Sequence, residues 1–383
     1  MTIFLLIFFI LLIIYSFVID FYRRAWKQVP VYDIDDVKNV KISVIISVRN
    51  EEQNVSQLLT LLDNQRFPKD SFEVIFVDDH SEDNTLNILK NTKSEHLSVV
   101  ILQLPDGIFS KKKAIEYGIK SANGELIITT DADCKMGPFW IKSYASFYKK
   151  TGAIFIAAPV IMETHNSFRD IFQSLDFIAM QAITGASVHK HFHTMCNGAN
   201  LAYTKLAFIE ANGFEGIDEI PSGDDMLLMH KIFSIHPEKV LYMKNKEAIV
   251  TTHPEPSWKN FIHQRIRWSS KAVHYKDRRI FNVLLFTYLL NLCFLVLAIA
   301  SIFKVSWLSF LLLFILAKIL IEFPFVNAAV IFFGQQRLMK YFSFLQPIHI
   351  LYVIVSGWLG RFGSYEWKSR TIKNKGRGTL VKQ

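Results

Sequence analysis

The chain has 383 residues, of which 51% are hydrophobic and 33 are phenylalanine, and its formal net charge is +9. This length is enough for one large domain or two smaller ones, and the apolar content is high for a soluble protein. The charge does not indicate a nucleic-acid partner, because much of it lies in residues 361–383, and a basic tail after an apolar helix is typical of contact with anionic lipid.

The first apolar segment, residues 3–19, contains no charged residue and predicts a membrane helix. It lacks the basic start and the small-residue cleavage site of a signal peptide. Arg23, Arg24 and Lys27 follow it directly. Since cytoplasmic flanks carry an excess of basic residues, we expect an uncleaved anchor with its N-terminus outside. The chain is then an integral protein of the cytoplasmic membrane, with residues from 20 to about 275 in the cytoplasm.

Apolar strands and helix-like segments alternate from residue 41 to residue 130. This alternation predicts an α/β fold with a mostly parallel central sheet and helices on both faces. Ligands bind such sheets at the carboxyl ends of the strands. The polar residues that follow the predicted strands are Arg49, Asn50, Glu51, Asp78, Asp79, His80, Ser81, Asp131 and Asp133. We therefore expect these side chains to line one edge of the sheet.

Asp131, Ala132 and Asp133 follow the strand that begins at Leu126. Two carboxylates at a strand end are suitable ligands for Mg²⁺ or Mn²⁺, which keep coordination positions open for phosphate oxygens. Taken alone, the pattern favours a solvated loop over a metal site. Lys113, in the upstream segment SKKKA, could meet a diphosphate, although adjacent lysines are usually a solvated surface.

The next part of the chain has a mixed pattern. Residues 153–160 predict a strand, residues 165–192 a helix, and residues 196–204 a turn that leads into another strand. The segment GDDMLLMHKIF predicts a helix with Asp224 and Asp225 in its first turn. These acids are explained either by helix capping, through Ser222 or Asp224, or by a general base whose pKa a second carboxylate raises.

The segment HPEPSWKNFIHQRIRW, which ends at Trp268, precedes the second apolar region. Gln264, Arg267 and Trp268 share one turn of its predicted helix. Singly, an arginine and a tryptophan beside a bilayer are ordinary interfacial anchors. Together they also suit a clamp for a diphosphate and an apolar platform for a sugar ring.

Three more apolar segments, residues 281–303, 306–333 and 341–359, predict membrane helices. If all three crossed, the basic tail would lie outside, against the charge rule. We therefore expect the last segment, which contains Pro347 and Gly357, to be interfacial or re-entrant rather than a third span.

The middle segment contains Lys318 and Glu322, four residues apart. Charges at membrane depth are costly, so we expect these side chains to pair and to face protein. A structural ion pair is a simpler explanation than a transport pathway.

The chain contains, in this order, the segments SVIISVRNEEQNV, FEVIFVDDHSEDNT, KKKAIEYGIKSANGELIITTDADC, SGDDMLL and QRIRW. Over residues 41 to about 272 it resembles the family 2 glycosyltransferases, which have the Rossmann-like GT-A fold. The apolar segments are similar to those of its membrane-integrated branch, which includes cellulose, chitin, hyaluronan and poly-N-acetylglucosamine synthases and ceramide glucosyltransferases. The resemblance implies an anchor at 1–22, a GT-A domain at 38–275, membrane helices at 276–360 and a basic cytoplasmic tail at 361–383.

The resemblance also implies roles for single residues. Those expected to hold the nucleotide sugar, a UDP-sugar, are Val48, Asn50, Glu51, Asp79, Lys113, Asp131 and Ala132. Those expected at the diphosphate and the acceptor are Gln264, Arg267, Trp268, Asn197 and Asn200. The metal ligands are Asp133, Asp131 and an additional His253, and the base is Asp225 beside Asp224. Two positions depart from the family pattern, since Val48 replaces a proline and Asp224 replaces a glutamate.

The implied activity is an inverting, metal-dependent transfer of a hexose or N-acetylhexosamine to a lipid-linked or glycan acceptor at the membrane, which forms a β-linkage. Few apolar segments follow the GT-A domain, so we expect a single or short addition, with a processive polysaccharide synthase as the alternative. A nucleotidyltransferase would need a glycine-rich phosphate loop after the first strand, and residues 41–55 contain no glycine. A non-catalytic membrane subunit would not need the acids and Arg267. The sequence leaves the oligomeric state open.

Overall fold

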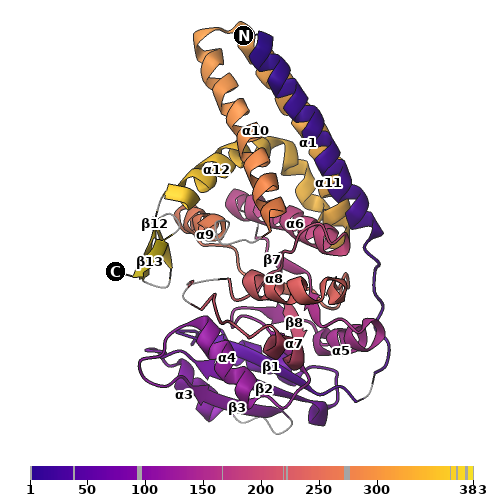
Figure 1. Cartoon of the computed structure of the whole chain (residues 1–383), viewed down its shortest axis with the longest axis vertical. Coiled ribbons are helices and arrows are strands. Elements are labelled where there is room, and N and C mark those ends of the chain that lie inside the picture. The colour runs from indigo at the N-terminus through magenta and orange to yellow at the C-terminus, as the bar shows by residue number, and fades with distance from the viewer. Residues whose placement is uncertain are drawn as a thin grey trace. The chain divides into compact units, whose positions relative to one another are not determined.

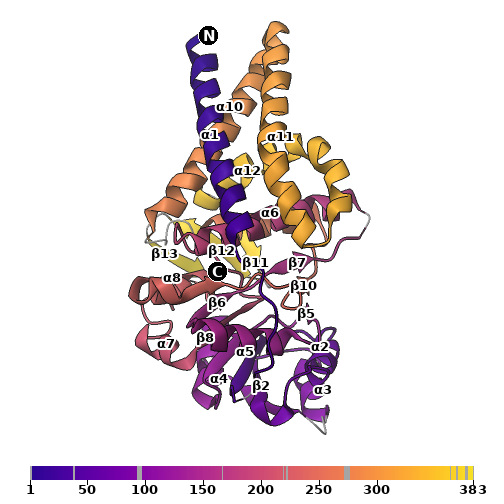
Figure 2. The same cartoon turned by 90° about the vertical axis from the view of Figure 1, so that its right-hand side faces the viewer.

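A computed structural model gives the structure of the chain (Figures 1 and 2). It describes residues 2–37, 39–92, 97–165, 167–218, 220, 223–270, 277–362, 364–367, 370–375 and 378–382.

The contacts within the chain divide it into two compact units. The sheet unit comprises residues 29–163 and 187–253, and the helix unit comprises residues 1–28, 164–186 and 254–383. The segments 164–186 and 254–270, which we expected to belong to the GT-A domain, group with the long apolar helices. Their side chains bond to one another and to the last helix of the chain, as described below.

The sheet unit is built on a seven-stranded sheet with the order β3-β2-β1-β4-β8-β6-β9. Its strands are β1 Ile42–Val48, β2 Phe72–Asp78, β3 Ser98–Gln103, β4 Leu126–Thr129, β6 Phe155–Ala157, β8 Leu201–Thr204 and β9 Val240–Tyr242. The first four strands pair in parallel, and only β8 runs antiparallel to its neighbours β4 and β6. The predicted mostly parallel sheet is confirmed.

The helices of the sheet unit connect these strands. They are α2 Val55–Asp63, α3 Thr85–Asn91, α4 Lys111–Ser121, α5 Trp140–Thr151, α7 Lys205–Glu210 and α8 Met226–Ile235, with short 3₁₀ turns at Lys69–Ser71 and Pro237–Lys239. Helix α4 packs on β1 and β2. A Cβ atom at Gly118 would lie 2.7 Å from Ile45 Cγ2, so the glycine permits this close approach.

A second sheet of three short strands lies in the same unit. Its order is β5-β10-β7, with β5 Lys135–Met136, β7 Val160–Met162 and β10 Val250–Thr252. The single strand that we expected over residues 153–160 is therefore divided between two sheets: β6 ends at Ala157 and β7 begins at Val160, after Pro159. A proline cannot donate to a strand ladder, which explains the break.

Among the residues that the structure describes, the helix unit contains four helices that are long and apolar enough to cross a membrane. Its helices are α1 Thr2–Gln28, α9 Trp258–Ser270, α10 Arg278–Phe303, α11 Ser306–Phe332 and α12 Phe342–Phe362, with the first part of α6 Phe168–His189 and a 3₁₀ turn at Gln336–Tyr341. Figure 1 shows α1, α10 and α11 side by side, with α12 crossing near one end of them. The interfacial placement of α12, which contains Pro347, stays a prediction.

The predicted pair in α11 is confirmed, because Lys318 Nζ lies 2.6 Å from Glu322 Oε1 and both side chains are buried. The C-terminal residues form the antiparallel strands β11 Ser364–Trp367, β12 Arg370–Lys375 and β13 Gly378–Lys382. The sequence pattern of the basic tail gave no indication of these strands.

Candidate functional site

The carboxyl ends of β1 and β2 meet at one edge of the large sheet. Val48 pairs with Asp78, and the next amide, Asp79 N, donates to Val48 O at 2.9 Å. Asn50 has a positive φ of 53°, and its Oδ1 accepts a hydrogen bond of 2.8 Å from Glu82 N. Because parallel strands end at the same edge, the expected nucleotide-binding residues of these two turns lie together.

Thr85, at the start of α3, fixes the turn after β1. Its Oγ1 accepts a hydrogen bond of 2.7 Å from Glu51 N, while the side chain of Glu51 accepts one of 2.8 Å from Asn54. Asp79 is 7% exposed. The polar residues of this edge are therefore held in place before any ligand is bound.

Asp131 and Asp133 follow β4, as the sequence predicted. Burial raises the pKa of the Asp133 carboxyl, and the carboxylates of Asp131 and Glu51 raise it further. Thr252 Oγ1 lies 3.4 Å from Asp133 Oδ2. Asp133 is thus a partly buried acid among like charges, an arrangement that a bound cation would stabilise.

Lys111, the first residue of α4, joins the acids of two loops. Its Nζ lies 2.6 Å from Asp131 Oδ1 and 3.1 Å from Asp224 Oδ2. Burial by itself would lower the pKa of Lys111, but the charges of Asp131 and Asp224 more than offset this effect, so the pKa lies above its ordinary value. Lys111 is therefore a cation in this site at physiological pH.

The three consecutive lysines of α4 have three different partners. Lys112 is buried and donates to the carbonyls of Ile217 and Ile220 at 2.5 and 2.7 Å. Lys113, which we expected at the nucleotide, lies 3.1 Å from Glu116 Oε2 on its own helix. Sequence reasoning did not single out Lys111. Ser110 could have indicated it, because serine is a common N-cap residue and places Lys111 at the first position of the helix. In the structure Ser110 Oγ accepts a hydrogen bond of 3.3 Å from Lys113 N.

Asp224 and Asp225 precede α8. The prediction from the sequence that they lie in its first turn is wrong. The N-cap is Asp225, whose Oδ1 accepts from Met226 N at 2.7 Å and whose Oδ2 accepts from Gly198 N at 3.1 Å. The alternative cap, Ser222, lies outside the described residues. The carboxylate of Asp225 is fixed by two backbone amides, and with about four acceptor positions it retains capacity for a further hydroxyl donor.

Gly198 lies where these groups converge. A Cβ atom at this position would be 3.5 Å from both Lys111 Nζ and Asp224 Oδ2, and 3.6 Å from Asp225 Cβ. The loop before β8 thus brings its backbone within van der Waals distance of the lysine and both acids.

The two asparagines expected near the acceptor support this loop. Asn197 Oδ1 accepts from Ala199 N at 3.0 Å. Asn200 is fully buried, accepts from Trp140 and Tyr144 at 2.9 and 2.8 Å, and donates to two backbone carbonyls at 2.8 Å. Since all of its amide groups are bonded inside the protein, Asn200 supports the loop and does not reach an acceptor, which corrects the expectation.

His253 lies in a row of side chains across the small sheet. The register of β10 against β5 and β7 brings it beside both Asp133 and Glu163. His253 Nδ1 lies 2.9 Å from Glu163 Oε2, and Glu163 Oε1 accepts from Lys135 Nζ at 2.6 Å. His253 is also close enough to Asp133 to oppose the rise in the pKa of that carboxyl.

The residues of the QRIRW segment lie on α9, in the helix unit. Gln264 Nε2 donates to Glu255 Oε1 at 2.8 Å, and burial raises the pKa of Glu255 against the opposing charges of Arg267 and Arg265. Arg265 is 3% exposed, with its guanidinium 4.2 Å from the centre of the Trp268 ring. The expected clamp residues thus belong to a helix fixed by a buried arginine that sequence reasoning did not single out.

Residues 43–202 match the family model described as glycosyl transferase family 2. These residues form a family 2 glycosyltransferase domain. The match covers β1, β2 and β4, whose ends hold the acids described above. The resemblance to the family 2 glycosyltransferases is thereby confirmed over these residues, which end before the segments SGDDMLL and QRIRW.

Two relatives of the glycosyltransferase domain illustrate the family. The chain is 26% identical over 255 residues to a probable glycosyltransferase, YdaM, of Bacillus subtilis, which covers 65% of this chain and 56% of that protein. It is 34% identical over 229 residues to the poly(ribitol-phosphate) beta-N-acetylglucosaminyltransferase TarS of Staphylococcus aureus, which covers 56% of this chain and 36% of TarS. The chain thus matches about half or less of the length of these relatives.

A solved structure shows the same fold. The mannosyltransferase PcManGT from Pyrobaculum calidifontis, in complex with GDP-Man and Mn²⁺, has a TM-score of 0.55 to this chain at 16% identity, and the likeness covers 92% of this chain and 95% of the other. The predicted GT-A fold, with its mostly parallel sheet, is therefore confirmed.

Proposed function

We propose that the chain is an inverting, metal-dependent glycosyltransferase. It moves a hexose or N-acetylhexosamine from a UDP-sugar to a lipid-linked or glycan acceptor and forms a β-linkage. The four long apolar helices support a membrane enzyme, and the basic residues after the first of them support a cytoplasmic catalytic domain. We propose a single or short addition as the mode of transfer, with processive synthesis as the alternative.

The observation that carries this proposal is the ion network around Lys111. The lysine contacts Asp131 on one side, at the strand end expected to bind the diphosphate, and Asp224 on the other, beside the expected base. A glycosyl transfer needs these two functions next to each other, because the leaving diphosphate and the attacking hydroxyl lie on opposite faces of one anomeric carbon. Lys111 links the residues for both functions in one network.

The residues at this edge fit a hard divalent cation. Asp131 and Asp133 offer carboxylate oxygens, and the raised pKa of Asp133 reports negative charge that a cation would neutralise. The described residues contain no cluster of three or more histidine, cysteine or acidic side chains that could hold a metal by itself. Mg²⁺ and Mn²⁺ are commonly held by one or two carboxylates together with substrate phosphates. When bound, the cation would supply charge stabilisation for the departing diphosphate.

The reaction requires one displacement. Asp225, fixed by Met226 N and Gly198 N, accepts the proton of the acceptor hydroxyl as its oxygen bonds to the anomeric carbon. The bond from that carbon to the β-phosphate oxygen breaks at the same time, and UDP leaves with the electron pair. Attack from the opposite face inverts the carbon, so an α-linked donor gives a β-linked product. The positive charge of Lys111 stabilises the negative charge that develops on the departing diphosphate.

The experiment uses membranes that contain the full chain, labelled UDP-hexoses and UDP-N-acetylhexosamines, Mn²⁺ and a lipid extract. We expect UDP release together with a labelled lipid or glycan, and no turnover in excess EDTA. Turnover that survives EDTA would contradict the metal requirement. Because PcManGT was solved with GDP-Man, a parallel arm supplies GDP-mannose, and transfer in that arm alone would contradict the choice of UDP.

The base is tested by Asp225→Asn. We expect transfer to fall by roughly a hundredfold or more, since general base catalysis contributes on that order. Asp63→Asn is the matched control, an acid 40% exposed and 3.8 Å from Lys69, and should retain the parental rate. If Asp225→Asn released UDP as fast as the parent with acceptor present, the assignment of the base would be wrong.

A further inference from the structure

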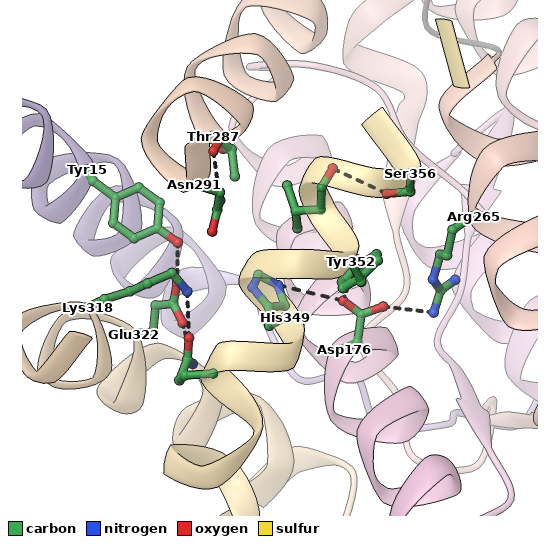
Figure 3. Close-up of polar contacts among 12 residues, drawn as sticks. Tyr15, Asp176, Arg265, Thr287, Asn291, Lys318, Glu322, His349, Tyr352 and Ser356 are labelled. Carbon is green, nitrogen blue, oxygen red and sulfur yellow. Dashed lines mark hydrogen bonds and ion pairs between the residues drawn. The ribbon is translucent and has the colours of Figure 1, made fainter. Parts of the chain in front are cut away.

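Asp176, on α6, is the centre of a buried polar cluster in the helix unit (Figure 3). Its Oδ2 lies 2.8 Å from Arg265 Nη2, and its Oδ1 accepts a hydrogen bond of 2.7 Å from Tyr352 OH. His349 Nε2 lies 3.9 Å from the same Oδ1. The side chains of Asp176 and Arg265 are 4% and 3% exposed, so the pair is shielded from solvent.

Arg265 connects this cluster to α9. Its guanidinium lies 4.6 Å from the centre of the Phe261 ring and 4.2 Å from that of Trp268, both on the same helix. Its Nη1 donates to Gln264 Oε1 at 3.3 Å. One buried cation thus contacts the acid of another helix and two residues of the QRIRW segment, Gln264 and Trp268.

Helix α12 supports the cluster from a second side. Figure 3 shows His349 and Tyr352 directed toward Asp176. One turn earlier, Gln346 Nε2 donates to Glu322 Oε2 at 2.8 Å, and its Oε1 accepts from Lys318 Nζ at 2.6 Å. Tyr15 OH of α1 also bonds to Glu322. The same face of α12 therefore joins the ion pair of α11 to the ion pair that supports α9.

We propose that Asp176 is a positioning residue for α9. It fixes Arg265 and, through it, the rotation and depth of the helix that carries Gln264, Arg267 and Trp268. Asp176 does not act on a substrate. The inference rests on the proposed function and on the roles at the diphosphate and the acceptor that the family resemblance implies for these three residues.

The physical argument is the cost of a buried charge. Arginine stays protonated, so without Asp176 the charge of Arg265 would lose the carboxylate that it contacts, and Glu255 would be the remaining acid on which its charge acts. The helix unit relieves that cost by moving Arg265 toward water, and α9 moves with it. A displacement of about 1 Å in groups that position a substrate is enough to lower a rate by roughly a hundredfold.

The first measurement is hydrogen exchange on the full chain in lipid nanodiscs. In Asp176→Asn, we expect the amides of α9, residues 258–270, to exchange at least about tenfold faster, while those of β1 keep the parental rate. Unchanged exchange in α9 would overturn the proposal. Faster exchange in both units would also overturn it, because it would show a general loss of stability.

The second measurement separates transfer from donor use. Asp176→Asn should lower the kcat for transfer to an acceptor by roughly tenfold to a hundredfold and raise the KM for the UDP-sugar by a smaller factor, because α9 carries residues expected at both the diphosphate and the acceptor. A changed donor KM with an unchanged transfer kcat would contradict a role through α9. If the parent chain transferred no sugar at all, the proposed function would fail, and hydrogen exchange would still decide the role of Asp176.

Milder variants keep the test decisive if Asp176→Asn does not fold. Tyr352→Phe removes one hydrogen bond from Asp176 without a change of charge, and we expect a smaller acceleration of exchange confined to α9 and α12. Ser356→Ala is its matched control, because Ser356 is a buried residue of the same helix whose hydroxyl bonds to Val353 O at 3.4 Å. Equal exchange of α9 in the two variants would overturn the proposal.

Discussion

The two units differ in how their acids are paired: those compared in the helix unit are buried, and those in the sheet unit are partly exposed. In the helix unit, Glu322 and Asp176 each contact a basic side chain and a tyrosine hydroxyl. In the sheet unit, Asp131, Asp133, Asp224 and Asp225 gather at one edge, and Lys111 contacts two of them. The first arrangement is balanced within the protein, whereas the second has an excess of negative charge.

We interpret this difference as one between acids that stabilise the fold and acids that bind a ligand. Breaking a balanced pair in an apolar region costs stability, because removing one partner leaves the other as a buried charge without a counter-ion. An unbalanced cluster is costly to keep, and the raised pKa of Asp133 is a sign of that cost. Substitutions in the helix unit should therefore reduce stability, and Asp176→Asn should also lower transfer through α9, whereas substitutions of the acids in the sheet unit should reduce activity.

The largest effect on stability is expected for Lys318→Met. This change leaves Glu322 buried without the basic side chain that it contacts and should destabilise the protein by about 3–5 kcal/mol, seen as a lower thermal midpoint in detergent. The double variant Lys318→Met with Glu322→Gln should recover much of the loss. A double variant that is less stable than the single one would contradict the description of these residues as a balanced pair.

Lys111 and Lys113 offer a matched comparison within α4. Lys111→Ala should lower transfer by about a hundredfold, because it removes a fixed cation between the acids at the reacting centre. Lys113→Ala should change transfer by less than about twofold, since its exposed pair with Glu116 contributes little. Equal losses in the two variants would show that the ion network does not distinguish these lysines.

The smallest effect is expected at Glu163, which orients His253. If His253 binds the cation through Nε2, Glu163→Gln should weaken the affinity for Mn²⁺ in the presence of UDP by about tenfold. Electron paramagnetic resonance of free Mn²⁺ measures this affinity without any turnover. Unchanged affinity in both Glu163→Gln and His253→Ala would exclude His253 as a ligand.

The sequence predicted the parallel half of the sheet and its acidic edge well. Strands β1, β2 and β4 are apolar runs that end in polar turns, and such runs pair in parallel when helices connect them. The small sheet β5-β10-β7 escaped prediction because its strands have two or three residues, too few to show a period. Asp133 and His253 were expected at the metal from the resemblance, whereas the contact of His253 with Glu163 escaped prediction together with this sheet.

Other residues could not be placed because their roles depend on distant contacts. Lys111, Lys112 and Lys113 are identical in type, and their partners differ only because their side chains leave α4 in different directions. Lys111 contacts Asp131 in the site, Lys112 donates to a buried carbonyl, and Lys113 pairs with Glu116 on its own helix. Arg265 is one of two arginines in QRIRW, and its burial depends on Asp176, 89 positions earlier in the chain. A motif identifies which residue types are present, whereas the fold decides which of them reach the ligand.

The central claim, that the acidic edge of the sheet unit is built for a ligand at a cost to stability, is tested most directly by Asp133→Asn. The asparagine has nearly the same shape and removes a charge whose pKa is raised in the folded protein, so at neutral pH the folded state should lose a destabilising interaction. We predict that the thermal midpoint of the ligand-free chain is equal to or above that of the parent, while transfer from the UDP-sugar falls by roughly a thousandfold. A lower midpoint together with retained transfer would contradict the account.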